Sequence, residues 1–278
     1  MKRLLSIAAI LLAGCAKDPH PGRTRLVLAP VVGSAFVREF QEFVDGSMTV
    51  SSDGKSESFP LFKEENRKAE DEILEADGVR ILSLRRKVTA WDLKRRGPAD
   101  PAPVPVPISL VGKTYVVRRT ELGTELEGVE ASLDELRANS LDQMESVLSL
   151  PEYPVGVGDS WPIHGERIVA SFGGDGGRGL KIREARGTAH FEGAVPGNPP
   201  VALISVRIEV EGAFRSLLDV DVWMDYRATF RIDIDKNRLV AMDASAEGKI
   251  NGELDRQGKP AVYQGTFRYS GRASSTPR

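Results

Sequence analysis

The sequence has a single cysteine, Cys15, among 278 residues. A disulfide within the chain needs two cysteines, so core packing must stabilise the folded body. Histidine is almost as scarce, and His20, His164 and His190 share no spacing typical of metal ligands. We therefore predict no metal, no cofactor and no catalytic residue, and we expect a protein that is not an enzyme.

An excess of charge of one sign and long apolar runs are also lacking. The chain has 38 basic and 40 acidic residues, a formal net charge of −2. No basic patch is concentrated enough to predict nucleic acid as a partner. The clearest apolar run, residues 4–12, is far shorter than the roughly 20 residues that a membrane-spanning helix needs.

The start of the chain has the order of a secretory signal. Lys2 and Arg3 precede the apolar run 4–12, and the tetrapeptide Leu-Ala-Gly-Cys ends at Cys15. This ending resembles the bacterial lipobox. In lipobox proteins the cysteine thiol receives a diacylglyceryl group, the preceding bond is cut, and the new amino terminus is acylated with a chain such as palmitate. The resemblance implies a signal peptide over 1–14 and lipidation of Cys15.

The lipobox resemblance also implies a location. Ala16 follows the cysteine, as it often does in lipobox proteins of the outer membrane. We expect a lipid-anchored protein of the cell envelope, at the outer membrane and facing the periplasm or the surface. Residues 15–23 are polar and turn-rich, which predicts a lipidated tether. The alternative is an ordinary secretory signal that happens to contain a cysteine.

Period-two alternation dominates the C-terminal half. Between residues 218 and 234 every second side chain is apolar, and the interleaved ones are mostly charged. This pattern predicts a strand with one buried face. At about 3.4 Å per residue the strand would exceed the usual length, so it must bend or contain a bulge. A turn at 235–238 and a returning strand at 239–250 predict a hairpin.

Further segments show the same alternation, and short turns between them favour an antiparallel sheet. Phenylalanines at helical spacing leave 36–44 open between helix and strand. Residues 100–107 contain four prolines and are predicted as an extended loop or edge. The further predicted strands are 79–93, 114–120, 180–195, 206–214 and 261–269.

One helix is predicted. Ser132 to Glu135 fits a capping box, and an apolar stripe follows as far as Pro151. The predicted fold is mainly β (α+β): a strongly curved antiparallel sheet or half-barrel with one amphipathic helix packed on its concave face. We expect a single β-rich domain over 24–272, with two halves meeting near 150–160 as an alternative, and a disordered tail over 273–278.

The most distinctive run is 150–161, Leu-Pro-Glu-Tyr-Pro-Val-Gly-Val-Gly-Asp-Ser-Trp. With Leu-Val-Gly-Lys-Thr at 110–114, it resembles a group of uncharacterised bacterial lipoproteins and secreted proteins, over roughly 70–272. That group implies no activity. The residues themselves predict a structural role, with a turn at Gly158-Asp159 and Trp161 starting a strand as a core residue.

A lipobox, a curved sheet and an inner helix together resemble the periplasmic lipoprotein-carrier and lipid-binding half-barrels. An apolar concave face holds acyl chains in those proteins, which implies a lipid or another apolar ligand as partner. The alternative is that the same side chains form a filled core, as protein interiors usually do. The candidate lining residues are Val220, Val222, Met224, Tyr226, Phe230 and Ile232.

Three sequence patterns partly resemble ligand-binding sites, but none of them is interpreted as one. The glycine-rich run 173–179 lacks the Gly-Lys-Ser/Thr ending of a phosphate loop. The run 233–244 lacks the glycine and glutamate of a calcium loop. Asp219, Asp221 and Asp225 are interpreted as a solvated strand face.

The sequence therefore predicts a membrane-anchored extracytoplasmic lipoprotein that binds an apolar ligand or serves as an envelope scaffold. Two alternatives stay open. One is an envelope hydrolase that uses a carboxylate pair. The other is a protein–protein interaction module.

Overall fold

The structure is a computed structural model. It describes residues 22–78, 80–97, 100–120, 123–139, 141, 148–172, 180–214, 220–255 and 260–278. The predicted signal peptide, Cys15 and the glycine-rich run 173–179 lie outside the described residues. In the part of the chain that is described, no helix combines the length and the apolar character needed to cross a membrane.

Among the described residues, twelve strands form one open antiparallel sheet, as predicted. Its order is β6-β5-β3-β2-β1-β12-β11-β10-β9-β8-β7, with β4 beside β3. The strands are β1 (Ala35–Ser52), β2 (Lys55–Ala76), β3 (Ile81–Arg96), β4 (Val104–Pro105), β5 (Thr114–Thr120), β6 (Gly123–Glu127), β7 (Ser160–Ile163), β8 (Leu180–Val195), β9 (Val201–Phe214), β10 (Val220–Asp233), β11 (Arg238–Asp255) and β12 (Pro260–Pro277). Two short helices are described, α1 (Leu133–Ala138) and α2 (Gly165–Phe172).

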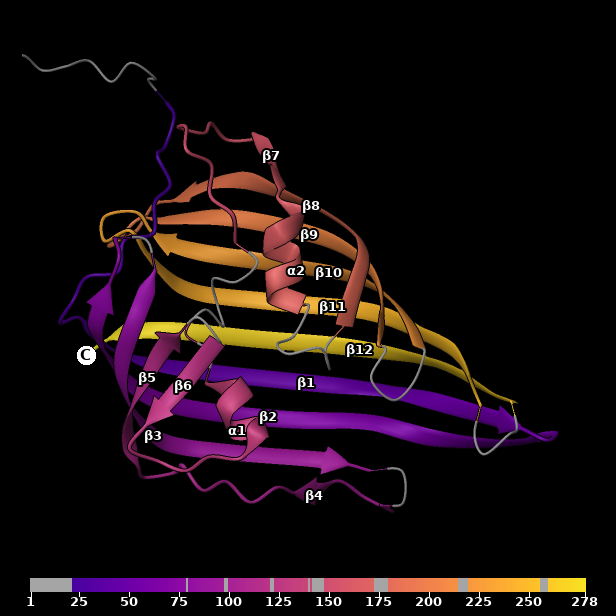
Figure 1. Cartoon of the computed structure of the whole chain (residues 1–278). Helices are drawn as coiled ribbons and strands as arrows, with labels where there is room; N and C mark the ends of the chain where they lie inside the picture. The colour runs from indigo at the N-terminus through magenta and orange to yellow at the C-terminus, as the bar shows by residue number, and fades with distance from the viewer. Residues whose placement is uncertain are drawn as a thin grey trace, which may run out of the picture.

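The sheet curves around both helices. In Figure 1, α1 lies over the β2–β3 side and α2 over β8–β11, both on the concave face, and the long strands run on past α2 to a narrow end. The pairing of β1 with β12 joins the two halves of the chain, from Phe36↔Pro277 to Ser52↔Ala261. The first and last long strands therefore lie side by side at the centre of the sheet.

The predicted hairpin is confirmed. Strands β10 and β11 pair antiparallel, and the even-numbered side chains of β10 face the interior. The register shifts between Arg231 and Ile232, so the long strand both curves and contains the expected irregularity. Asn237 has a φ of 49°, a left-handed conformation that asparagine tolerates in turns.

The open interpretation of 36–44 resolves to strand β1. Phe36 and Phe40 are 4% and 5% exposed and point into the core, whereas Phe43 is on the other face and 42% exposed. The helical spacing of these rings was therefore coincidental. The proline-rich run 100–107 contributes the short edge strand β4.

Strand β2 was not predicted. Its 22 residues are rich in glutamate and lysine, which favour helices in isolation. Antiparallel pairing with β1 on one side and β3 on the other holds the segment extended. Because the strand is central, its inward positions Glu65, Arg67 and Asp71 are buried charges.

The capping box of α1 is confirmed. The Ser132 hydroxyl accepts from the Glu135 amide, and the Glu135 carboxylate accepts from the Ser132 amide. The described helix ends at Ala138, and positions 140 and 142–147 of the longer predicted helix lie outside the described residues. Leu133 is 55% exposed, so it does not belong to a buried stripe. The second helix, α2, had no counterpart in the sequence prediction.

The prediction of a disordered tail over 273–278 is wrong. Strand β12 continues to Pro277, and Ala273, which is 1% exposed, pairs with Phe40 of β1. Arg278 donates a 2.7 Å hydrogen bond to Glu70 on β2. The small side chains of this stretch conceal the alternation of apolar and polar residues that marks the other strands. Pairing with β1 holds the stretch in the sheet.

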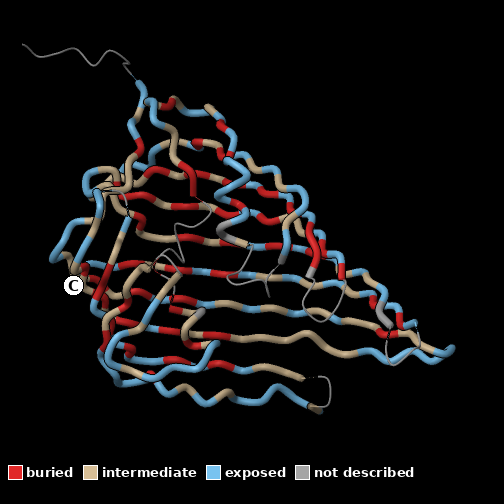
Figure 2. The backbone as a smooth tube through the Cα atoms, in the orientation of Figure 1, coloured by how far each residue is buried: buried red, intermediate tan, exposed pale blue. Residues whose placement is uncertain are grey.

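The apolar core lies mainly under the two helices. Figure 2 shows buried residues concentrated there, with intermediate and exposed residues more common toward the narrow end. Trp161 is 4% exposed and donates a 2.5 Å hydrogen bond from its ring N–H to the Ser149 carbonyl, which confirms its predicted core position. Gly158, with a φ of 91°, forms the turn before it.

Candidate functional site

The concave face divides into an apolar part and a charged part. The apolar part lies on β10–β12 beyond the end of α2, and we call Met224, Ile250, Phe267 and Tyr269 the apolar trough. The charged part lies on β1–β3 beneath α1, and we call Arg38, Arg67, Asp71 and Arg86 the arginine cluster.

The trough begins where the filled core ends. Phe172, the last residue of α2, contacts Tyr226 edge-on, with ring centroids 5.3 Å apart and an interplanar angle of 71°. Tyr226 in turn lies 6.5 Å from the Tyr269 ring. Farther toward the narrow end, Met224 and Phe267 are only half-buried. Val222 and Tyr263, nearer the narrow end, are buried again, so the half-buried stretch is bounded by buried side chains.

Glycine shapes the floor of the trough. Gly248 on β11 pairs with both Met224 and Phe267. A Cβ at Gly248 would lie 2.2 Å from Cζ of Phe267. The missing side chain therefore lets the Phe267 ring lie across the neighbouring strand, where it forms part of the apolar surface.

The six predicted lining residues all lie on the inward face of β10. Phe230 and Ile232 are 0% and 1% exposed and share a core cluster with Trp161 and Ile168, so this end of the strand is filled core. Val220, Val222 and Tyr226 are also buried, and Met224 is the half-buried member of the set.

The sequence reasoning missed the other trough residues, Ile250, Phe267 and Tyr269. They come from two different strands, and only the register β10–β11–β12 brings them beside Met224. The alternation in 239–250 and 261–269 was a usable signal for their inward direction. A ligand role for any lining residue stays a prediction.

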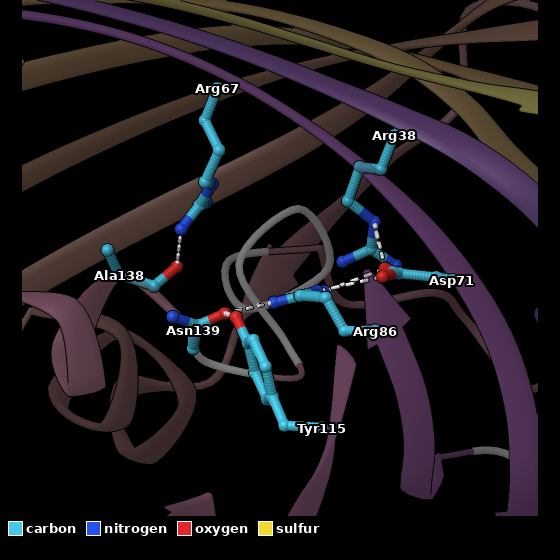
Figure 3. A network of polar contacts seen from close by, with 7 residues as sticks. All are labelled: Arg38, Arg67, Asp71, Arg86, Tyr115, Ala138 and Asn139. Atoms are coloured by element: carbon cyan, nitrogen blue, oxygen red, sulfur yellow. Dashed lines mark hydrogen bonds and ion pairs between the residues drawn. The ribbon is translucent and has the colours of Figure 1, made fainter. Parts of the chain in front are cut away.

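The arginine cluster is built around a double hydrogen bond. Arg86 on β3 donates to both carboxylate oxygens of Asp71 on β2, from Nε at 2.8 Å and from Nη2 at 2.7 Å. Nε of Arg38 on β1 lies 3.6 Å from the same carboxylate (Figure 3). Burial favours a neutral Asp71, but the Arg86 and Arg38 guanidiniums hold its pKa below the ordinary value. The pair is therefore ionised at neutral pH.

The end of α1 binds into this cluster. Asn139 accepts through its side-chain oxygen from Nη1 of Arg86 at 3.0 Å and from the Tyr115 hydroxyl at 2.6 Å. The side-chain amide of Asn139 donates to the backbone carbonyl of Glu135. Arg67 donates to the carbonyl of Ala138, as Figure 3 shows. These contacts satisfy carbonyl groups that a helix end otherwise leaves unpaired.

Arg67 occupies an aromatic environment. Its guanidinium lies 5.3 Å from the Phe40 ring and 5.0 Å from the Trp91 ring, within the range of cation–π attraction. Burial, followed by repulsion from Arg86, lowers its pKa to about 10.

The convex face carries paired carboxylates. Asp225 was interpreted as part of a solvated face, but its side chain is only 11% exposed, and it accepts from Arg227 at 2.8 Å and from Arg207 at 3.2 Å. Partial burial works to raise its pKa, but the two arginines lower it below the ordinary value. Asp221 pairs with Arg183 at 3.0 Å, and Asp219 lies outside the described residues.

Asp243 is held in the same way, by Arg231 and by Arg272. Hydrogen bonds from these arginines lower its pKa. A general acid must carry a proton near neutral pH, and neither Asp225 nor Asp243 can do so. Neither residue can therefore be the general acid of an enzyme that uses a carboxylate pair.

A polar chain on the convex face includes one of the three histidines. Nδ1 of His190 lies 2.8 Å from the Ser160 hydroxyl, and Nε2 lies 3.8 Å from Glu192. The side chains of Ser160, His190 and Glu192 are well exposed, so water competes for each contact. Over the described ranges, no group of three or more histidine, cysteine, aspartate or glutamate residues is arranged to hold a metal ion.

No protein-family model matches the chain, and no curated protein matches it. Among solved structures, the chain is similar to a structure of lipid–protein interactions in lipovitellin, with a TM-score of 0.44 and 8% identity over 86% of this chain. It spans only 25% of that chain. A crystal structure of Pseudomonas aeruginosa OpdQ aligns over 87% of this chain and 98% of its own, with a TM-score of 0.17 and 7% identity. The likenesses are distant, so a function must be argued from the residues of this chain.

Proposed function

We propose that this protein is a lipid-anchored envelope protein that holds an acyl chain, or a similar apolar ligand, in the apolar trough. The observation that carries the proposal is the half-buried state of Met224, Ile250, Phe267 and Tyr269 on one concave surface. Apolar surface left in water costs about 25 cal/mol per Å². Half-buried apolar side chains on paired strands of a curved sheet therefore favour an apolar occupant.

The anchor in this proposal is Cys15, and the first residues of the folded body follow it closely in the chain. Thr24 pairs with Val155 through backbone hydrogen bonds of 2.7 and 2.9 Å, and Leu26 is buried in the core. Only residues 15–23 then separate the lipid from the folded body, a span of at most about 32 Å. The body would stay near the bilayer, where acyl chains are abundant.

The scaffold alternative rests on the filled part of the face. Phe230, Ile232 and their cluster leave no room for a ligand under α2. A pure scaffold would need no accessible apolar surface beyond that cluster. The half-buried trough therefore favours the binding role.

Native mass spectrometry of the full chain tests the ligand. We expect a co-purifying lipid mass in a Cys15→Ser chain, where no covalent lipid confuses the spectrum. Met224→Glu, which places a charge in the trough, should remove that mass. The matched control is Trp223→Glu, one residue away on the convex face and 41% exposed, which should retain it. A clean protein mass from several expression hosts would reject the binding role.

Metabolic labelling tests the anchor separately. Radiolabelled palmitate should be incorporated into the wild-type chain and lost in Cys15→Ser. Undiminished labelling of the variant would contradict lipidation at this residue.

A further inference from the structure

The end of the sheet opposite the narrow end is made of turns and of one crossing segment. Strands β8 and β10 end where β9 and β11 begin, so the turns 196–200 and 234–237 meet at this end. The segment 22–34 runs across it, and the Ala29 amide donates to the Asn237 carbonyl at 2.9 Å. Figure 1 shows the start of the described chain and the C-terminus on this side of the molecule. We call these turns, the crossing segment and the loop 151–158 the wide end.

Apolar side chains project from the wide end into solvent. Single exposed apolar residues are ordinary on a protein surface, but several at one end of a molecule mark a contact surface. The loop 151–158 lies against the end of β8, because the Gly158 amide donates to the Phe191 carbonyl at 2.9 Å. Among the described residues, five apolar side chains at this end are each at least 48% exposed: Val31, Val32, Tyr153, Val157 and Val195.

The chain enters the folded body at the same place. Thr24 pairs with Val155 through backbone hydrogen bonds of 2.7 and 2.9 Å, and the Arg23 guanidinium donates to a carbonyl of the same loop at 3.1 Å. Val155 lies between Tyr153 and Val157 in the sequence. The entry point of the chain is therefore fixed beside two of the exposed apolar side chains.

The tether limits how the body can face a bilayer that holds a lipid on Cys15. Residues 15–23 span at most about 32 Å. Strand β1 has 18 residues, and at about 3.4 Å each it runs about 60 Å from the wide end to the narrow end. With the narrow end on the bilayer, the entry point of the chain would lie beyond the reach of the tether.

The convex face is also a poor contact for lipid. It carries the ion pairs of Asp225 and Asp243 with arginines, and charged groups lose hydration when they are covered by an apolar phase. The wide end, which holds the entry point of the chain and the exposed apolar side chains, remains as the surface that faces the bilayer.

We infer that the wide end docks on the bilayer that holds the lipid anchor, with Tyr153, Val157 and Val195 in the interfacial layer. This inference rests on the anchor of the proposed function and is independent of the ligand in the trough. Tyrosine favours the boundary between headgroups and acyl chains, and valine gains from leaving water. Shallow contacts suffice, because the short tether keeps the wide end at a high local concentration beside the bilayer.

Quenching by spin-labelled lipid tests the docking. The thiol of a lipidated Cys15 is blocked, so an introduced cysteine is the free thiol that takes a fluorescent label. Tyr153→Cys reports on the wide end, and Val262→Cys, on the convex face at the narrow end and 38% exposed, is the matched control. In the full lipidated chain, reconstituted in phosphatidylcholine vesicles that contain doxyl-labelled lipid, the label at 153 should be quenched and the label at 262 should not.

Charged variants test the side chains themselves. Val157→Asp combined with Val195→Asp should remove the quenching at 153, because carboxylates resist transfer out of water. Trp223→Asp combined with Val262→Asp, both on the convex face, should leave it unchanged. All four side chains are exposed, so both double variants should keep the wild-type unfolding temperature. Equal quenching at 153 in the two double variants would overturn the role of Val157 and Val195.

Three further outcomes would overturn the inference in distinguishable ways. If the mass of the purified wild-type chain contains no lipid, the anchor of the proposed function fails and the docking fails with it. If the chain is lipidated but the label at 153 is quenched no more than the label at 262, only the docking fails. If the emission of the label at 153 is already shifted to the blue without vesicles, in proportion to protein concentration, a second copy of the chain covers the wide end instead of lipid.

Discussion

Arg86 and Asp71 meet through two parallel hydrogen bonds of 2.8 and 2.7 Å between adjacent strands, with both side chains at most 2% exposed. Asp71 belongs to β2, the strand that the sequence patterns did not predict. Arg86 belongs to β3, the next strand along the chain. The pair fixes the end of α1 through Asn139.

Removing one partner of this pair should be strongly destabilising. Arg86→Met leaves a buried carboxylate without its two donors, which costs about 3–5 kcal/mol of unfolding free energy. Asp71→Asn should also destabilise, and the double variant should lose less than the sum of the two single losses. Urea unfolding of the four chains measures this coupling. Additive losses would mean that the two residues do not act as a pair.

Acid should weaken the fold through Asp71. Its pKa in the folded chain is below the ordinary value of 3.8, because Arg86 and Arg38 outweigh the effect of burial. A depressed folded pKa contributes stability that is complete above the unfolded pKa and lost as pH falls through the folded one. The free energy of unfolding, measured by urea between pH 6 and pH 2, should fall more steeply in the wild-type chain than in Asp71→Asn. Equal slopes would contradict the assignment.

Gly248 should control the trough. An alanine there would place a Cβ 2.2 Å from Cζ of Phe267 and 2.9 Å from the Trp223 carbonyl, so the ring must swing away. We expect Gly248→Ala to weaken the binding of Nile red, a neutral apolar dye, to the trough. It should also destabilise the chain by about 1–3 kcal/mol. The control is Gly54→Ala at the tip of the β1–β2 hairpin, where a Cβ meets no atom within 4 Å; its φ of 72° causes local strain but leaves the trough intact. Unchanged dye binding in Gly248→Ala would show that the ring does not line the site.

Deleting residues 273–278 should destabilise the sheet. The deletion removes five pairs with β1, from Phe36↔Pro277 to Phe40↔Ala273, and exposes the inner end of that strand. Ala273 is 1% exposed, so the loss includes buried contacts as well as hydrogen bonds. Thermal unfolding of the truncated and full chains measures the effect. An unchanged unfolding temperature would support the loose tail that the sequence suggested.

Local patterns predicted much of the sheet but little of the site. The alternation in 218–234 and 239–250 predicted β10 and β11 because a half-buried strand imposes period two on its own residues. The capping box at Ser132 likewise concerns neighbouring residues, and it formed as expected. Strand β2 went unrecognised because its glutamates and lysines suit a helix, and pairing on both edges overrides that preference.

The arginine cluster could not be predicted from one sequence. Arg38, Asp71, Arg86 and Asn139 belong to four different elements, and nothing in their spacing along the chain distinguishes them from surface charges. They meet because β1, β2 and β3 are consecutive in the sheet and α1 covers their inward face. The trough has the same origin, since Gly248, Met224 and Phe267 meet only through the register of three strands.

The sequence by itself determined the antiparallel β character, the turn at 235–238, the capped start of α1 and the core position of Trp161, because each depends on residues close together in the chain. Tertiary structure alone decided that the last strand pairs with the first, that a charged segment runs through the centre of the sheet, and that Arg38, Asp71 and Arg86 meet on its concave face. Those outcomes depend on strand order and register, which bring distant residues together and leave no periodic trace in the sequence.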